Sequence, residues 1–263
     1  MFGFQKVSRF YIYETSGGSM FSFTRKTLSI AILSSISLCS TQAVAGEKTG
    51  FSGNGELGFS NSTGNTDSNA LYAALKMQYL QARYDVLGGI EISDKSENGT
   101  QTESRYAIDA QYNRYYAEDK NFYSYLGGKL THSKFEDIDL ETTASVGLGK
   151  RLYKTERVLL TGQVGIGYQN TDYISATASE DQVVYQAKLD YSNQINNYVK
   201  FTQDLIVNAG NEQTKTEANT GLSVKIAEQM KLKASFKYRN NSNPAPGTEK
   251  TDTLTLVSVI YDF

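Results

Sequence analysis

The chain has 263 residues, with 19 Tyr, 12 Phe and 22 Gly but no Trp and only 2 Pro, a composition that favours strands over helices. A mean hydropathy of −0.44 excludes a membrane-spanning helix of ~20 apolar residues beyond the N-terminal region. The formal net charge is −2 and no basic residues cluster, which argues against nucleic acid as a partner.

Residues 1–45 have the pattern of an N-terminal extension followed by a signal peptide. Arg25 and Lys26 precede the short apolar run TLSIAILSSISL, and AVA at residues 43–45 supplies a small-x-small cleavage site. Met20 stands where such a signal begins, so we expect translation to start there and cleavage to follow Ala45. Residues 46–263 then form the mature domain, with 22 basic and 27 acidic residues and a net charge of −5.

From Phe51 onward, apolar or small residues recur at every second position in segments of about ten residues, the period of a half-buried β-strand. Twelve such segments can be counted. The clearest are residues 51–59, 71–79, 140–148, 158–168, 183–191, 218–226 and 255–263.

The connections between these segments alternate in length. Five short ones lie near residues 80–82, 117–121, 154–157, 195–197 and 227–229, and six longer polar ones lie near 61–68, 94–101, 133–139, 170–181, 209–215 and 240–250. Bacterial outer-membrane barrels have an even number of antiparallel strands with short turns on the periplasmic side and longer loops outside. The pattern therefore predicts an all-β, transmembrane, up-and-down barrel of about 12 strands.

Aromatic residues gather next to the short connections and at the C-terminus, where they indicate a girdle at one membrane interface. This set comprises Tyr79, Tyr84, Tyr112, Phe122, Tyr153, Tyr191, Phe201, Tyr261 and Phe263. The last segment keeps one apolar face to its final residue. We expect it to close the barrel against the first segment, because an open sheet edge in lipid leaves costly unpaired backbone groups.

Three stretches resemble the bacterial family of salt-induced outer membrane proteins, also called domain of unknown function 481. They are GELGFSNSTGNTDSNAL at 55–71, FTQDLIV at 201–207 and NNSNPAPGTEKTDTLTLVSVIYDF at 240–263. The resemblance covers essentially the whole mature chain. It implies an outer-membrane β-barrel of a Gram-negative bacterium with a link to salt or envelope stress, and it supplies no reaction or substrate.

The residues and motifs that could indicate catalysis, nucleotide binding or cation binding are better explained by structural roles. The only histidine, His132, falls by parity on the lipid face without a nucleophile motif, so no catalytic residue is predicted. The run GQVGIG at 162–167 has the wrong spacing for a nucleotide loop. The acidic residues Glu97, Asp137 and Asp139 match no known cation-binding loop. We therefore predict no cofactor and no metal.

The opposite, inward parity collects charged residues of both signs, which are the candidate functional residues. They are Lys76, Arg105, Lys129, Glu141, Arg151, Lys188, Asp190, Lys200, Asp204, Lys225, Lys231, Lys233, Lys237 and Arg239, together with Asp85, Glu91, Asp109 and Glu217. If these charges pair across the lumen, they plug it. Otherwise they line a narrow polar path whose basic sector, from Lys231 to Arg239, favours anions.

The leading prediction is a non-enzymatic barrel of the cell outer membrane that serves envelope integrity under osmotic stress or passes small polar solutes slowly. Its expected partners are outer-membrane lipid, lipopolysaccharide and the barrel assembly machinery, which would engage the strand ending at Phe263. Two alternatives stay open: an outer-membrane barrel enzyme acting on lipid or peptide, and a periplasmic barrel that binds a small ligand. The periplasmic alternative requires the apolar parity to face inward.

Overall fold

The computed structural model describes residues 49–62, 68–175 and 179–263, so the predicted signal peptide and its cleavage site lie outside the described residues. Within the described part, no helix is long and apolar enough to cross a membrane. The described residues form twelve strands and one 3₁₀ turn, η1. Their bounds are β1 Gly50–Ser62, β2 Ser68–Leu80, β3 Tyr84–Glu97, β4 Thr100–Tyr115, β5 Phe122–Ser133, η1 Lys134–Glu136, β6 Ile138–Lys154, β7 Val158–Tyr173, β8 Glu180–Gln194, β9 Val199–Gly210, β10 Thr214–Lys225, β11 Met230–Asn241 and β12 Thr251–Asp262.

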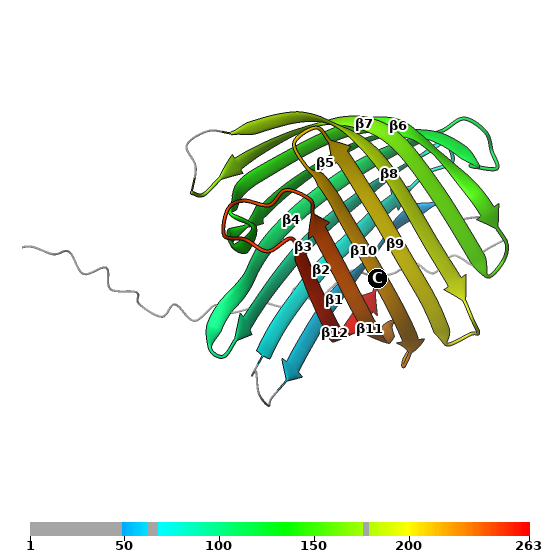
Figure 1. The fold of residues 1–263 in the computed structure, drawn as a ribbon. Helices are drawn as coiled ribbons and strands as arrows, with labels where there is room; N and C mark the ends of the chain where they lie inside the picture. Colours follow the sequence, from blue (N-terminus) through cyan, green and yellow to red (C-terminus); the bar gives the residue numbers. More distant parts are fainter. Residues whose placement is uncertain (1–48, 63–67, 176–178) are drawn as a thin grey trace, which may run out of the picture. The chain divides into compact units, whose positions relative to one another are not determined.

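The strands form one closed antiparallel barrel, in which each strand pairs with its neighbours in sequence (Figure 1). Closure is made by β1 and β12, where Gly55 faces Tyr261 and Leu57 faces Val259. A closed ring leaves no strand edge with unpaired N–H and C=O groups. The predicted twelve-stranded up-and-down barrel is confirmed.

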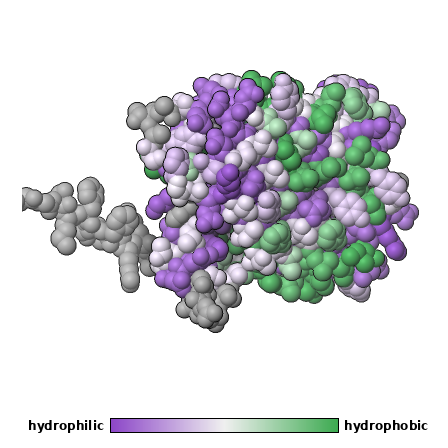
Figure 2. Space-filling model, in the orientation of Figure 1, coloured by the Kyte–Doolittle hydropathy of each residue, from purple (hydrophilic) through white to green (hydrophobic). Residues whose placement is uncertain are grey.

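The apolar rows predicted to face lipid point outward. Along β12, Val257 is 53% exposed whereas its neighbour Leu256 is 2% exposed. The same alternation is seen on β1, β5 and β7, where Leu57, Leu126 and Val164 are exposed and the preceding residues Glu56, Tyr125 and Gln163 are buried. Figure 2 shows hydrophobic residues gathered over the middle and lower right of the visible face, and hydrophilic ones toward the left. The charged rows therefore face the lumen. The periplasmic, ligand-binding alternative requires the opposite arrangement, with the apolar rows facing inward.

The predicted alternation of short and long connections is wrong in two places. Residues 94–101 and 209–215 were expected to be long loops, but β3 and β4 are joined by Asn98 and Gly99 alone, and β9 and β10 by residues 211–213. Asn98 and Gly99 have φ angles of 50° and 77°, as a tight type I′ hairpin requires. The polar residues around these turns belong to strands that continue, so polarity alone did not mark a loop.

The two ends of the barrel are named here by the chain ends. The terminal rim carries the ends of β1 and β12 and the connections at residues 81–83, 116–121, 155–157, 195–198 and 226–229; the distal rim carries the other connections. Predicted girdle residues meet at the terminal rim. The ring centroids of Tyr84 and Tyr112 are 5.8 Å apart, and those of Tyr191 and Phe201 are 6.1 Å apart.

Candidate functional site

The candidate charged residues lie on inward-facing rows, and they divide into two groups by their height along the barrel. Those in the distal halves of their strands are Glu91, Arg105, Lys129, Glu141, Glu217, Lys237 and Arg239. Those in the terminal halves are Lys76, Asp85, Asp109, Arg151, Lys188, Asp190, Lys200, Asp204, Lys225, Lys231 and Lys233. The two groups have different surroundings.

Seven inward-facing residues in the distal halves form one connected network of ion pairs, which we call the lumen cluster. It holds three carboxylates and four cations, a net charge of +1. Its members are Glu91, Glu103, Arg105, Lys129, Glu217, Lys237 and Arg239. They come from β3, β4 and β5 on one side and from β10 and β11 on the other.

The lumen cluster joins opposite walls of the barrel. Arg105 on β4 and Glu217 on β10 are six strands apart in either direction around the ring, yet their side chains approach to 3.7 Å. Lys129 on β5 reaches the same carboxylate, with 2.7 Å between Nζ and Oε1. Contacts of this kind require the two walls to lie close together, because each side chain spans only part of the lumen.

Glu91 is the hub of the lumen cluster. It accepts hydrogen bonds from Arg105 at 3.1 Å, Lys237 at 2.6 Å and Arg239 at 3.0 Å. The hydroxyl of Tyr72 donates to the same carboxylate at 3.0 Å. Lys237 also lies over the ring of Tyr72, with its Nζ 3.9 Å from the centroid, a geometry that stabilises a desolvated ammonium.

Three of the four cations in the lumen cluster are largely removed from water, since Arg105 is 4%, Lys237 6% and Arg239 9% exposed. Charges at such positions cost several kcal/mol each to desolvate, and their carboxylate partners offset that cost. Arg105 has one buried nitrogen, Nε, that finds no hydrogen-bond partner. The cluster is thus nearly, but not fully, satisfied.

Further ion pairs flank the lumen cluster. Lys215 on β10 contacts Glu141 on β6, and Lys233 on β11 lies 3.0 Å from Glu56 on β1, which also accepts a hydrogen bond of 2.6 Å from Ser258. Glu56, Glu103 and Lys215 are absent from the predicted set. Strand parity could have found all three, but Glu103 lies beside a segment that was taken as a loop, and Lys215 lies within another.

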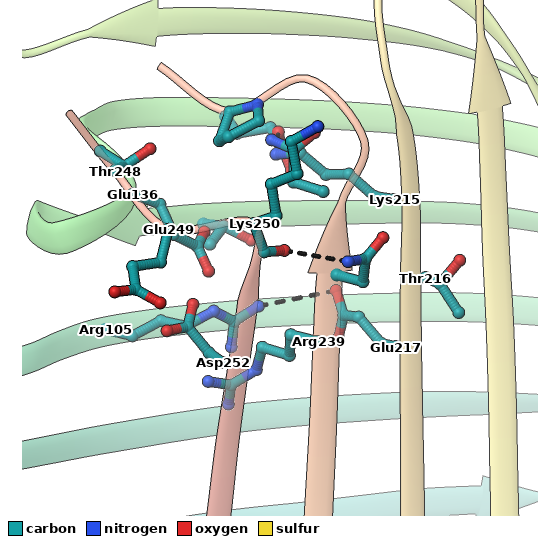
Figure 3. A pocket seen from close by; sticks show the side chains of 15 residues that line it. Arg105, Glu136, Lys215, Thr216, Glu217, Arg239, Thr248, Glu249, Lys250 and Asp252 are labelled. Atoms are coloured by element: carbon teal, nitrogen blue, oxygen red, sulfur yellow. Dashed lines mark hydrogen bonds and ion pairs between the residues drawn. The ribbon is translucent and has the colours of Figure 1, made fainter. Parts of the chain in front are cut away.

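A small cavity of about 30 Å³ opens beyond the lumen cluster at the distal rim. Its lining combines Arg105, Glu217 and Arg239 with Glu249 and Lys250 of the connection at 242–250. Figure 3 shows Arg105 and Glu217 pointing toward one another in this cavity. The cavity is therefore a vestibule that ends at the ion pairs.

The terminal half of the lumen is not crossed in this way. Lys188 pairs with Asp190 on the same strand at 3.2 Å, and Lys231 pairs with Asp262 on the adjacent strand. Arg151 lies over the ring of Tyr115, 5.7 Å from its centroid. Within the described residues, the side chains of Lys76, Lys200, Asp204 and Lys225 form no hydrogen bond or ion pair. The lumen is thus asymmetric, with charges joined across it only in the distal half.

The remaining candidates for chemistry lie apart from the lumen. His132 faces outward near the distal rim, as predicted, with its Nδ1 2.7 Å from the backbone oxygen of Asp139. The run GQVGIG lies inside β7 rather than in a loop. No group of three or more His, Cys, Asp or Glu within the described residues is arranged to hold a metal ion.

Among solved structures, the barrel is similar to an outer membrane channel from Pseudomonas putida F1, with a TM-score of 0.52 and 11% identity over 87% of this chain and 100% of that one. The NanC porin has a TM-score of 0.47 and 12% identity over 81% of this chain and 97% of its own. For the translocator domain of the autotransporter NalP from Neisseria meningitidis, the TM-score is 0.48 and the identity 14%, over 82% and 89% of the two chains.

At 11% identity, the likeness to the Pseudomonas channel shows a shared fold, that of an outer-membrane barrel. No curated protein sequence matches the chain. The model of one sequence family matches residues 55–263, which is nearly the whole barrel. The chain therefore belongs to the family described as protein of unknown function, DUF481.

Proposed function

We propose that the protein spans the outer membrane as a non-enzymatic barrel whose lumen admits, at most, ions and small polar solutes. Exposed apolar residues on eleven of the twelve strands, all except β9, support a membrane location, because a soluble protein rarely exposes apolar patches of such size. The fold shared with an outer membrane channel supports it further. We include lipopolysaccharide and the barrel assembly machinery, through the strand ending at Phe263, among its partners.

The single observation that carries the proposal is the contact between Arg105 and Glu217. It closes the distance between opposite walls, so that a hydrated solute has to displace paired side chains to pass. Barrels of this size lie between those filled by side chains and those with a wide water channel. In its distal half, the side chains of the lumen cluster make this barrel similar to the smaller barrels that side chains fill.

The same network supports a second candidate, a barrel that conducts nothing and serves the integrity of the envelope. Its motivating observation is that Glu91 alone holds three cations, an arrangement suited to a permanent plug. A role under salt or osmotic stress rests on the family resemblance. If the protein has this role, a strain from which its gene is deleted should lyse more readily than the parent strain after a shift to high salt.

Planar-bilayer recording of the purified protein distinguishes these candidates. We expect small stepwise currents from the wild type, and larger, anion-selective currents from the double variant Glu91→Gln/Glu217→Gln, which leaves four cations facing one remaining carboxylate. The matched control is Glu156→Gln/Glu228→Gln, which removes two exposed carboxylates from terminal-rim turns. Silence from both wild type and double variant would favour the plug, and wide-porin currents from the wild type would refute both.

A further inference from the structure

The outward face of β6–β9 has a shallow apolar groove of about 490 Å³, which lies in the terminal halves of β6 and β7 and near the middle of β8 and β9. Gly162 on β7 and Ala187 on β8 form its floor, because they are the small members of two adjacent rows. In one row Gly162 faces Leu189, and in the next Val164 faces Ala187. Larger side chains stand around this floor: Leu148, Leu189, Leu205, Val207 and Leu152, whose Cδ1 packs against Gly162, 3.0 Å from where a Cβ would lie.

A single cation lies in the lining of this groove on the outward face. Lys150 alternates with the exposed residues Leu148 and Leu152 and is itself exposed. It faces Gly162 on one side and Phe122, a residue of the aromatic girdle, on the other. Its side chain forms no hydrogen bond or ion pair within the described residues.

An unpaired ammonium on a lipid-facing row is costly in the hydrocarbon region, and the cost falls when the side chain extends to the interface and meets an anion. The protein itself offers no such anion there. In the terminal halves of the twelve described strands, the outward-facing rows contain no Asp or Glu. A second copy of the barrel packed against this face would bury the apolar groove but would bring no carboxylate from these rows to Lys150.

We propose that this groove binds a phospholipid of the membrane leaflet nearest the terminal rim. An acyl chain lies over Gly162 and Ala187, and the headgroup phosphate contacts Lys150. The apolar surface of the groove suits the acyl chain of such a lipid, and the cation at its edge suits the phosphate. The inference rests on the proposed membrane location and adds a specific ligand to it.

The test is native mass spectrometry of the protein reloaded from nanodiscs that contain phosphatidylglycerol and phosphatidylcholine in equal amounts. We expect the wild type to retain one phospholipid, with phosphatidylglycerol preferred. Gly162→Leu/Ala187→Leu fills the groove and should lower retention about tenfold. Lys150→Gln should keep the lipid but lose the preference for phosphatidylglycerol.

Two control variants make the same chemical changes elsewhere. Ala234→Leu enlarges an outward-facing residue on β11, and Arg83→Gln removes a charge from the exposed turn at 81–83. Both should retain lipid like the wild type. Equal retention in the filled variant would overturn the inference, as would a dimer that the filled variant converts to a monomer. Neither result affects the proposed function, which fails instead if the native protein stays in solution without detergent.

Discussion

Gly53 and Phe263 close the barrel together. They exchange two backbone hydrogen bonds of 2.9 Å, one from each N–H to the other residue's carbonyl. The ring of Phe263 lies over Gly53 so closely that a Cβ there would be 2.7 Å from the ring. Phe51 packs beside it, with 6.2 Å between ring centroids. The last residue of the chain therefore seals the seam between β1 and β12, and it needs a glycine in the facing strand to do so.

Gly53→Val should destabilise the barrel by about 1–3 kcal/mol, the usual range for overpacking. The added side chain would meet both the ring of Phe263 and the backbone oxygen of Lys76 at 2.8 Å. Gly55→Val is the matched control, since it lies on the same strand and face with nothing within 4 Å of its Cβ position. Thermal unfolding in detergent measures both. Equal stability of the two variants would show that the seam tolerates the extra volume.

Strand parity predicted which rows of side chains face outward and which face the lumen, because the direction of a side chain in a strand depends only on local geometry. In a strand, successive side chains point to opposite faces, so assigning Val257 and Val259 to lipid placed Leu256 and Ser258 inside. His132 follows the same alternation and faces outward, although its neighbours in the sequence are polar. Eighteen charged residues could be assigned to the inward-facing rows on parity alone, and their role in the lumen stays a prediction.

Strand parity did not predict two features of the structure, namely one tight hairpin and the pairing of charges within the lumen. The hairpin at Asn98 and Gly99 has a strong local signal, but it was outweighed by the polar residues around it. The partners within the lumen have no local signal at all, because the contact between Arg105 and Glu217 depends on the curvature and stagger of the closed sheet rather than on spacing in the sequence.

Tyr123 and Gly149 should be strongly coupled. The side chain of Tyr123 on β5 covers Gly149 on β6, so that a Cβ at residue 149 would overlap its ring and hydroxyl. Gly149→Ala alone should destabilise the barrel by about 1–3 kcal/mol. In the double variant Gly149→Ala/Tyr123→Ala the cost of the added methyl should disappear, a coupling that a double-mutant cycle measures. Additive effects of the two changes would contradict the contact.

Glu91 should matter far more to stability than an exposed carboxylate on the same strand. Glu91→Ala leaves Arg105, Lys237 and Arg239 without their shared partner, which should cost about 3–5 kcal/mol. Glu97→Ala removes a partner of Lys95 at the exposed end of β3 and should cost less than about 1 kcal/mol. Chemical denaturation in detergent compares the two. A small loss for Glu91→Ala would mean that water compensates the cations.

Spin labels on β12 provide a direct test of which rows meet lipid. After substitution to cysteine, labels at Val257 and Val259 should be accessible to oxygen, which concentrates in hydrocarbon, and shielded from a water-soluble nickel chelate. A label at Lys76, which faces the lumen in its terminal half, should show the opposite preference. The mature chain has no other cysteine if cleavage follows Ala45, because Cys39 is the only one in the sequence. Preference for the nickel chelate at Val257 and Val259 would place these residues in water, and it would remove the basis for a membrane location and for a lumen that restricts solutes.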